Sequence, residues 1–182
     1  FDTNFFGLSA LMALVIPGMR QRRYGRIINI SSLSGRVSVP GTSAYNASKW
    51  AVEGLSEAVR FELLPFNVFV SLVEPGMYKT DIFSGNKQLA KRAQEPSSAY
   101  FQAGQRFQKM VDKMVQRSTS DPKDVANTVC EIAFSKAPGL RYVVGKDARV
   151  AVRAKTWLPE RVFESLLMRR LKFLFTEGDG GA

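Results

Sequence analysis

The sequence predicts an α/β protein whose helices and strands alternate along the chain. Three short runs rich in β-branched residues, bounded by glycine or proline, have the length and composition of buried strands. Between them lie longer segments in which apolar residues recur every three or four positions, as on one face of a helix. Strands that alternate with helices generally form a parallel sheet. With 182 residues and 45% hydrophobic content, the chain is large enough for one globular domain with a sizeable core.

Two long helices are predicted in the first third of the chain. Residues 2–23 have helical spacing, with a kink expected at Pro17, and residues 43–64 form a helix that ends before Pro65. The inner side of the second helix is expected to consist of Ala47, Ala51, Leu55, Ala58 and Val59.

The strands and the remaining helices follow in order. Strands are predicted at residues 27–31, 68–73 and 142–144. Asp121-Pro122 is a typical helix start, a capping residue followed by proline, and opens a helix that runs to about Ser135. One or two amphipathic helices around Pro159 are predicted within residues 153–175.

Two other segments have no strand pattern. Residues 77–118 begin in a polar stretch and become helical, which predicts a lid over a site. The lid's aromatic and methionine side chains would suit an apolar substrate, although such a stripe is more often ordinary packing. These residues are Phe83, Tyr100, Phe101, Phe107, Met110 and Met114. Residues 176–182 are expected to form a disordered tail.

Composition excludes several classes of active site. The sequence has no histidine, which removes Ser-His-Asp and Cys-His catalysis and histidine-based metal sites, so no metal site is predicted. Its single cysteine, Cys130, cannot form an internal disulfide and is expected in the core. The net charge of +10 is attributed to solvated helix ends and faces, not to nucleic-acid binding, because no nucleic-acid motif accompanies the arginine clusters.

The chain has two candidate membrane contacts, and neither is favoured by the sequence. The apolar run at residues 5–16 has about twelve residues, which is too short to span a bilayer, and is expected to be a buried helix. Leucines and arginines alternate around residues 158–172, as on a helix that lies on an anionic membrane. Packing onto the domain or a partner subunit is the preferred interpretation. No signal peptide is visible, although the chain opens on Phe1, and a cytoplasmic location is the default expectation.

The pentad Tyr45-Asn46-Ala47-Ser48-Lys49 is the main functional signal. On a helix, the Tyr45 hydroxyl and the Lys49 ammonium lie on one face. A nearby cation stabilises phenolate and so lowers a tyrosine pKa, which suits a general acid or base in carbonyl and alcohol redox chemistry. The pattern recurs at Tyr142 and Lys146, but on a predicted strand, where residues four apart are about 13 Å apart and cannot interact in this way.

Further residues around the pentad occur in an ordered series. The series consists of Asn4, residues 25–32, Gly35, Pro40, Glu74-Pro75-Gly76 and Thr80. With it, the chain resembles a short-chain dehydrogenase/reductase, closely so from residue 1 to about residue 82. The resemblance implies a Rossmann-like, doubly wound parallel sheet. Residues 1–175 would be the C-terminal part of that single domain and hold the last three of its roughly seven strands.

The resemblance also implies a role for each matching residue. Tyr45 would protonate a carbonyl oxygen, positioned by Ser32, while NAD or NADP in its reduced form supplies hydride. Lys49 would bind the nicotinamide ribose and lower the Tyr45 pKa, and Asn4 would hold a water that links Lys49 to solvent. The positions expected to contact the nicotinamide end of the cofactor are Pro75, Gly76, Met77 and Thr80.

One part of the family pattern does not occur in this sequence. There is no Gly-rich turn between a first strand and a first helix, the feature that holds the pyrophosphate of a dinucleotide. The expected explanation is that the chain is the C-terminal portion of a longer enzyme, and that it binds nucleotide poorly and turns over little by itself. The choice between NAD and NADP depends on the other half, so the sequence leaves it open.

Three functions are compatible with these residues. The leading one is NAD(P)-dependent interconversion of a small-molecule carbonyl and a secondary alcohol, with a lipophilic substrate as one option. The alternatives are a catalytically silent interaction module, which would not need the Ser32, Tyr45 and Lys49 trio, and a nucleotide-sugar epimerase, which uses the same pentad. The helices at 2–23 and 43–64 resemble those that pair between subunits in this family, so a homodimer or homotetramer is expected.

Overall fold

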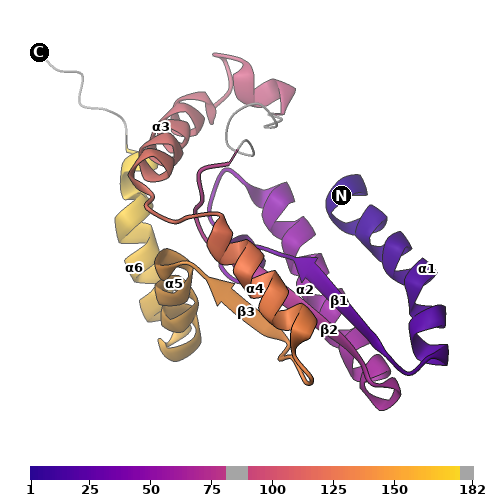
Figure 1. Cartoon of the computed structure of the whole chain (residues 1–182). Helices are drawn as coiled ribbons and strands as arrows, with labels where there is room; N and C mark the ends of the chain where they lie inside the picture. The colour runs from indigo at the N-terminus through magenta and orange to yellow at the C-terminus, as the bar shows by residue number, and fades with distance from the viewer. Residues whose placement is uncertain (81–89, 177–182) are drawn as a thin grey trace, which may run out of the picture. The chain divides into compact units, whose positions relative to one another are not determined.

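The computed structural model describes residues 1–80 and 90–176, and its chain divides into two compact units (Figure 1). Unit 1 comprises Phe1–Met77 and Ser120–Val152, and unit 2 comprises Tyr78–Thr119 and Arg153–Ala182. The predicted Phe83 of the lid and the predicted tail at 177–182 lie outside the described residues.

A parallel sheet of three strands forms the centre of unit 1. Strands β1 (Gly25–Ile30), β2 (Val68–Pro75) and β3 (Arg141–Val144) lie side by side in that order. Ile30 pairs with Val73, and Pro75 pairs with Val144, so the carboxyl ends of the strands meet at one edge of the sheet. The predicted α/β fold with a parallel sheet is confirmed, and β2 extends two residues further than predicted, to Pro75.

Helices cover both faces of this sheet (Figure 1). On one face pack α1 (Gly7–Gln21), preceded by a π-helical turn η1 (Asp2–Phe6), and α2 (Ser43–Leu63). On the other face packs α4 (Lys123–Phe134), near which the Arg26 side chain donates to the Ser135 carbonyl at 3.2 Å. The core between α1, α2 and the sheet contains Met12, Ile27, Leu63, Val68 and Val70.

Helix α1 is less buried than predicted. Met12 packs in the core, but Leu11 and Leu14 on the opposite side are 65% and 77% exposed, so the prediction of a buried helix is wrong for that side. Together with η1 it forms one helix, Asp2–Gln21, which is long and apolar enough to cross a membrane. The sequence had indicated that this segment is too short to span a bilayer. The length of the helix in the structure does not exclude a span. A mostly buried core helix passes the same test, but only 6% of this span is buried, and its contact with the core is made through Met12 and its neighbours.

The buried side of α2 is polar, which the sequence did not predict. Leu55 and Val59 pack against the core as expected, but Ala47 and Ala58 are exposed. The buried positions are Asn46, Ser48, Val52, Glu53, Ser56 and Leu63. Several of these polar groups are hydrogen-bonded, as where Asn29 on β1 donates to the Ser56 hydroxyl at 2.8 Å. Such bonds allow a polar helix face to be buried.

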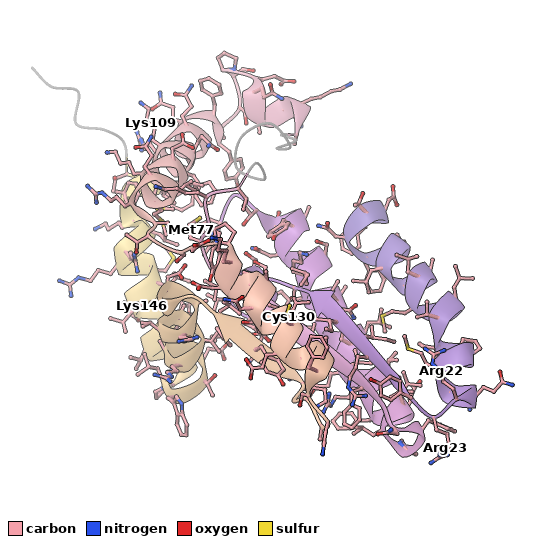
Figure 2. All side chains as sticks on the ribbon, in the orientation of Figure 1. Arg22, Arg23, Met77, Lys109, Cys130 and Lys146 are labelled. Atoms are coloured by element: carbon pink, nitrogen blue, oxygen red, sulfur yellow. The ribbon has the colours of Figure 1, made fainter. Side chains whose placement is uncertain are left out.

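The prediction that Cys130 lies in the core is wrong. Its thiol is exposed on α4, as Figure 2 shows. Helix α4 packs on the sheet through Ile132, which is buried. Cys130 lies two positions before Ile132, which is about 200° around the helix, and so it faces solvent.

The segment in which one or two helices were predicted, residues 153–175, contains parts of two helices. Helix α5 (Lys146–Trp157) begins earlier than predicted, and α6 (Glu160–Leu171) follows Pro159 and continues into the 3₁₀ turn η6 (Lys172–Leu174). In the predicted lid, η5 (Lys91–Gln94) and α3 (Phe101–Arg117) are helical. All of the lid from Tyr78 on belongs to unit 2, and its function as a lid stays a prediction.

Candidate active site

The predicted site residues of unit 1 lie at the carboxyl ends of β1 and β2, where open parallel sheets generally bind ligands. After β1, the Ser31 amide donates to the Val73 carbonyl at 2.8 Å, so the chain leaves the strand while still held to β2. Ser32 then begins the 3₁₀ turn η2 (Leu33–Gly35), against which α2 packs. At the end of β2, the Gly76 amide donates to the Val144 carbonyl at 2.9 Å.

Tyr45 and Lys49 lie one turn apart on α2, as the sequence predicts. The Lys49 Nζ is 5.8 Å from the centroid of the Tyr45 ring and donates a 3.0 Å hydrogen bond to the carbonyl of Ile30, the last residue of β1. The Lys49 ammonium is thus bonded to a residue that precedes Ser32 by two positions in the chain. Burial lowers the pKa of Lys49, and the nearby Glu53 carboxylate acts in the opposite direction. The ammonium therefore lies near the Tyr45 ring and is fixed to the end of β1.

Ser32 and Asn4 are each held by one hydrogen bond. The Ser32 hydroxyl accepts from the Ser34 amide at 3.1 Å, which caps η2. A serine hydroxyl has one donor and two lone pairs, so this cap leaves its O–H able to donate to a substrate oxygen. Asn4 in η1 donates from Nδ2 to the Ser48 hydroxyl at 3.1 Å, next to Lys49 in the chain. All four predicted catalytic residues belong to unit 1. Hydrogen bonds join Asn4 to the α2 segment that holds Tyr45 and Lys49, and join Lys49 to the end of β1, two residues before Ser32.

The turn after β2 is held by a residue that the sequence did not single out. Asp147, in the first turn of α5, accepts from the Met77 amide at 2.8 Å. A side chain at Gly76 would collide with the same carboxylate, so the backbone at Gly76 must remain bare. Met77 is labelled in Figure 2. An acidic residue in a first helical turn is common, which is why Asp147 gave no functional signal.

Thr80 is the predicted site residue that belongs to unit 2 and not to unit 1. It lies in unit 2, three residues after Met77, and is exposed. Its predicted contact with the nicotinamide end of the cofactor stays a prediction.

A buried ion-pair network lies between α2 and the sheet, and the sequence did not predict it. Glu74, the residue before Pro75, is fully buried, and one of its oxygens is 3.2 Å from the guanidinium of Arg36, just after η2. Arg141 of β3 lies 3.4 Å from Glu74 and 2.9 Å from each of two α2 carboxylates, Glu53 and Glu57. The network therefore joins the segments that carry Ser32, Tyr45 and Pro75-Gly76.

Burial and the neighbouring Glu53 carboxylate raise the pKa of Glu74 from 4.5 to about 7, although Arg36 and Arg141 act in the opposite direction. A carboxyl whose pKa is raised on folding stabilises the fold at low pH and loses that contribution as the pH rises through the folded-state value. We therefore expect this group to lower stability between about pH 5 and pH 8. Glu74→Gln, which imitates the protonated form, should flatten the fall in Tm over that range; a fall as steep as in the unchanged protein would contradict this.

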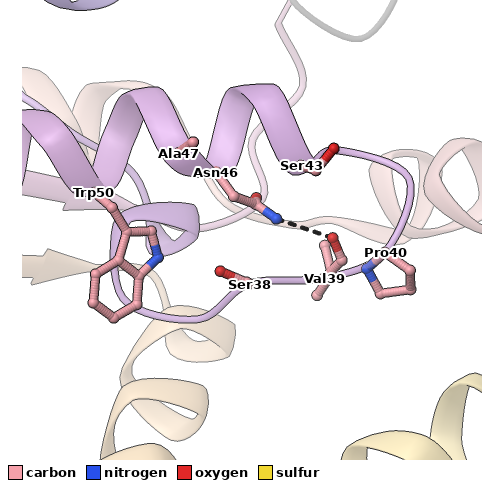
Figure 3. Close-up of a pocket in the computed structure, with 7 residues that line it drawn as sticks. All are labelled: Ser38, Val39, Pro40, Ser43, Asn46, Ala47 and Trp50. Atoms are coloured by element: carbon pink, nitrogen blue, oxygen red, sulfur yellow. Dashed lines mark hydrogen bonds between the residues drawn. The ribbon is translucent and has the colours of Figure 1, made fainter.

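A hollow of about 490 Å³ next to α2 does not coincide with these residues (Figure 3). It is lined by Ser38, Val39, Pro40, Ser43, Asn46, Ala47 and Trp50. Asn46 donates to the Val39 carbonyl at its wall at 2.9 Å. At about 100° per residue, Asn46 lies roughly 60° from Lys49 around the helix, whereas Ala47 lies roughly 160° from both Tyr45 and Lys49. The hollow therefore adjoins the helix that carries Tyr45 and Lys49, but neither side chain lines it. Across residues 1–80 and 90–176, no cluster of three or more metal-ligating side chains is found.

Comparison with known proteins identifies the family. The model of the short chain dehydrogenase family matches residues 1–91. The chain belongs to this family. The resemblance seen in the sequence is thereby confirmed. The match covers the segment that contains Tyr45, Lys49, Ser32, Asn4 and Pro75-Gly76.

Individual relatives extend the similarity along the chain. The chain is 36% identical over 172 residues to the uncharacterized oxidoreductase YusZ of Bacillus subtilis, covering 94% of this chain and 61% of that protein. It is 36% identical over 167 residues to the 3-ketodihydrosphingosine reductase of Bacteroides thetaiotaomicron, covering 91% of this chain and 61% of that protein. A solved short-chain dehydrogenase from Streptomyces avermitilis matches with a TM-score of 0.65 and 27% identity over 94% of this chain and 60% of that one. The chain thus spans about three fifths of the length of these relatives.

Proposed function

We propose that this chain supplies the proton-transfer part of an NAD(P)-dependent oxidoreductase that interconverts a carbonyl and a secondary alcohol. The observation that carries the proposal is the position of Lys49, one helical turn from Tyr45 and hydrogen-bonded to the end of β1 near Ser32. Membership of the short-chain dehydrogenase family supports the redox chemistry. A silent interaction module would not need this arrangement.

Each residue of the site has a distinct part in the proposed reaction. Bound NADH or NADPH would supply the hydride to the carbonyl carbon. Tyr45 would give its hydroxyl proton to the carbonyl oxygen, and in the oxidative direction its phenolate would remove that proton. Ser32 would donate a hydrogen bond to the same oxygen, and the Lys49 ammonium would stabilise the phenolate. Asn4, bonded to Ser48 beside Lys49, would hold the water through which the proton is replaced.

The residues present fit only one end of the cofactor. Pro75-Gly76 at the end of β2 matches the turn that the family places beside the nicotinamide, and Lys49 offers donors to ribose hydroxyls. The pyrophosphate and adenosine need a Gly-rich turn at a helix N-terminus, which this sequence does not contain. We therefore propose that a nucleotide-binding half, with the remaining strands of the sheet, completes the working enzyme next to β1. Among the described strands, β1 is paired on one side only, by β2.

The two halves make separable contributions that can be measured. The 182-residue chain alone should show no micromolar affinity for NADH or NADPH in isothermal titration, because most of the groups that bind the nucleotide are absent from it. The same chain joined to a nucleotide-binding half should bind one of the two nucleotides and oxidise it when an apolar ketone is added, as followed by absorbance.

Two results would contradict this proposal. Micromolar binding by the chain alone would show that it is not an incomplete nucleotide site. A completed enzyme that binds the nucleotide but oxidises none with any carbonyl, and reduces none with any alcohol, would refute the redox assignment.

A lipophilic ketone is the substrate class that we favour. The relative from Bacteroides thetaiotaomicron is named for a keto lipid, 3-ketodihydrosphingosine. In the predicted lid, the apolar side chains that are partly buried on α3 are Phe101, Phe107, Met110 and Met114. They would provide the apolar surface that such a substrate needs.

We also propose that α1 and α2 form a subunit interface in a homodimer or homotetramer. Both helices expose large apolar side chains on the side turned away from the sheet, and these include Leu11, Leu14, Trp50 and Phe61. Apolar surface of this kind commonly marks a protein interface. A cytoplasmic location stays a prediction.

A further inference from the structure

Helix α6, which is labelled in Figure 1, and the turn η6, both in unit 2, expose an apolar stripe. One side of this segment is packed and consists of Phe163, Leu167, Leu171 and Leu174, the last two fully buried. About 115° around the helix from the middle of this packed side, Val162, Leu166 and Phe173 are 44%, 53% and 46% exposed, and on its other flank Met168 and Phe175 are each 52% exposed. At 3.6 residues per turn, Val162, Leu166 and Phe173 lie within about 40° of one another around the helix and follow it for about 16 Å. The packing of this segment that the sequence predicts therefore applies only to the side that contains Phe163, Leu167, Leu171 and Leu174.

Cations border this stripe, and carboxylates do not. The exposed basic residues of this segment are Arg161, Arg169, Arg170 and Lys172, of which Arg169 and Arg170 lie within about 60° of the middle of the stripe. Around the helix, Arg169 lies on one flank of the stripe and Arg170 on the other. The two acidic residues of α6, Glu160 and Glu164, lie roughly 140° to 180° away from the stripe. Glu160 is also within 3.9 Å of Lys155, so its charge is partly offset there.

We propose that this face of α6 and η6 docks on an anionic membrane surface. A short helix with an apolar stripe between arginines and lysines can lie in the membrane interface, with its apolar side chains among the acyl chains and its cations near the lipid phosphates. The stripe is one helix wide, much smaller than the roughly 800 Å² per partner that a stable protein interface buries. Its size thus fits insertion into a lipid surface better than a protein partner. The proposal does not depend on the oxidoreductase activity.

The test is co-sedimentation of the 182-residue protein with vesicles of pure phosphatidylcholine and with vesicles that also contain phosphatidylserine. We expect binding to the anionic vesicles only, with strong weakening at high salt, because exposed charges are screened over a short distance. Each basic residue near an anionic surface contributes about 1 kcal/mol, so Arg169→Glu with Arg170→Glu should weaken binding at least tenfold. Leu166→Ser with Phe173→Ser should weaken binding to a similar extent.

A charge-matched control separates this face from the general charge of the protein. Lys113→Glu with Arg117→Glu makes the same change in net charge at exposed positions of a different helix, α3. We expect this control to keep vesicle binding within about threefold, and circular dichroism should show native helix content in every variant compared. Equal loss in the control, full binding by the Leu166 and Phe173 double variant, or binding to an acidic protein but not to anionic vesicles would overturn the proposal.

Discussion

Phenylalanine at position 45 will lower kcat for carbonyl reduction by about 10³-fold or more in the completed enzyme. The change removes only the phenolic hydroxyl and so takes away the proton donor, and a positioned acid typically contributes 10²-fold to about 10⁴-fold. The ring that faces the Lys49 ammonium is retained, at 5.8 Å in the unchanged protein, so the binding of NADH or NADPH should change less than about threefold. Steady-state kinetics with a ketone and titration of the nucleotide give both quantities.

The chain offers a matched control for this experiment. Tyr142 belongs to the second Tyr-x-x-x-Lys match but lies on β3, where its hydroxyl accepts from the Gly139 amide at 2.8 Å. Tyr142→Phe removes that one bond, which costs about 1 kcal/mol of stability, and should leave kcat nearly unchanged. If Tyr45→Phe retains more than a tenth of the activity, or if Tyr142→Phe loses as much, the assignment of the acid is wrong.

The order of helices and strands could be predicted because local patterns record it. The β-branched runs that became β1, β2 and β3, and the helix stop at Pro65, depend on residues close together in the chain. What failed was the prediction of which sides are buried. In α2, Glu53 and Ser56 are buried and accept hydrogen bonds from Arg141 and Asn29 in distant segments, whereas a test for apolar periodicity assigns such residues to solvent.

The candidate site was predictable to the extent that its residues belong to a motif. Tyr45, Lys49 and Ser32 were identified in the sequence, and the hydrogen bond from Lys49 to Ile30 explains how α2 is fixed to the end of β1. Asp147 was not identified, because its contact with Met77 spans 70 residues. The partners of Glu74 were missed for the same reason, since Arg36 and Arg141 come from two separate segments and share no spacing.

Alanine at position 141 will lower the free energy of unfolding by about 3 kcal/mol at pH 7. Arg141 is the cation shared by Glu53, Glu57 and Glu74, and its loss leaves two of these carboxylates buried with less compensation. Removing one partner of a buried ion pair commonly costs about 3 to 5 kcal/mol, and the lower figure applies because Arg141 is partly exposed. Urea unfolding of the unchanged protein and the variant measures the difference.

The reason for this loss can be tested through its partners. Glu57 is 44% exposed, so Glu57→Gln should cost less than about 1 kcal/mol, as surface ion pairs do. Glu74→Gln added to Arg141→Ala should restore part of the stability, because it removes one of the charges left without its partner. The cost of Arg141→Ala should also be smaller at pH 5 than at pH 8, since Glu74, with its pKa raised to about 7, is then mostly neutral. A cost that does not change with pH, and that Glu74→Gln does not reduce, would mean that Arg141 stabilises the protein through packing and not through these carboxylates.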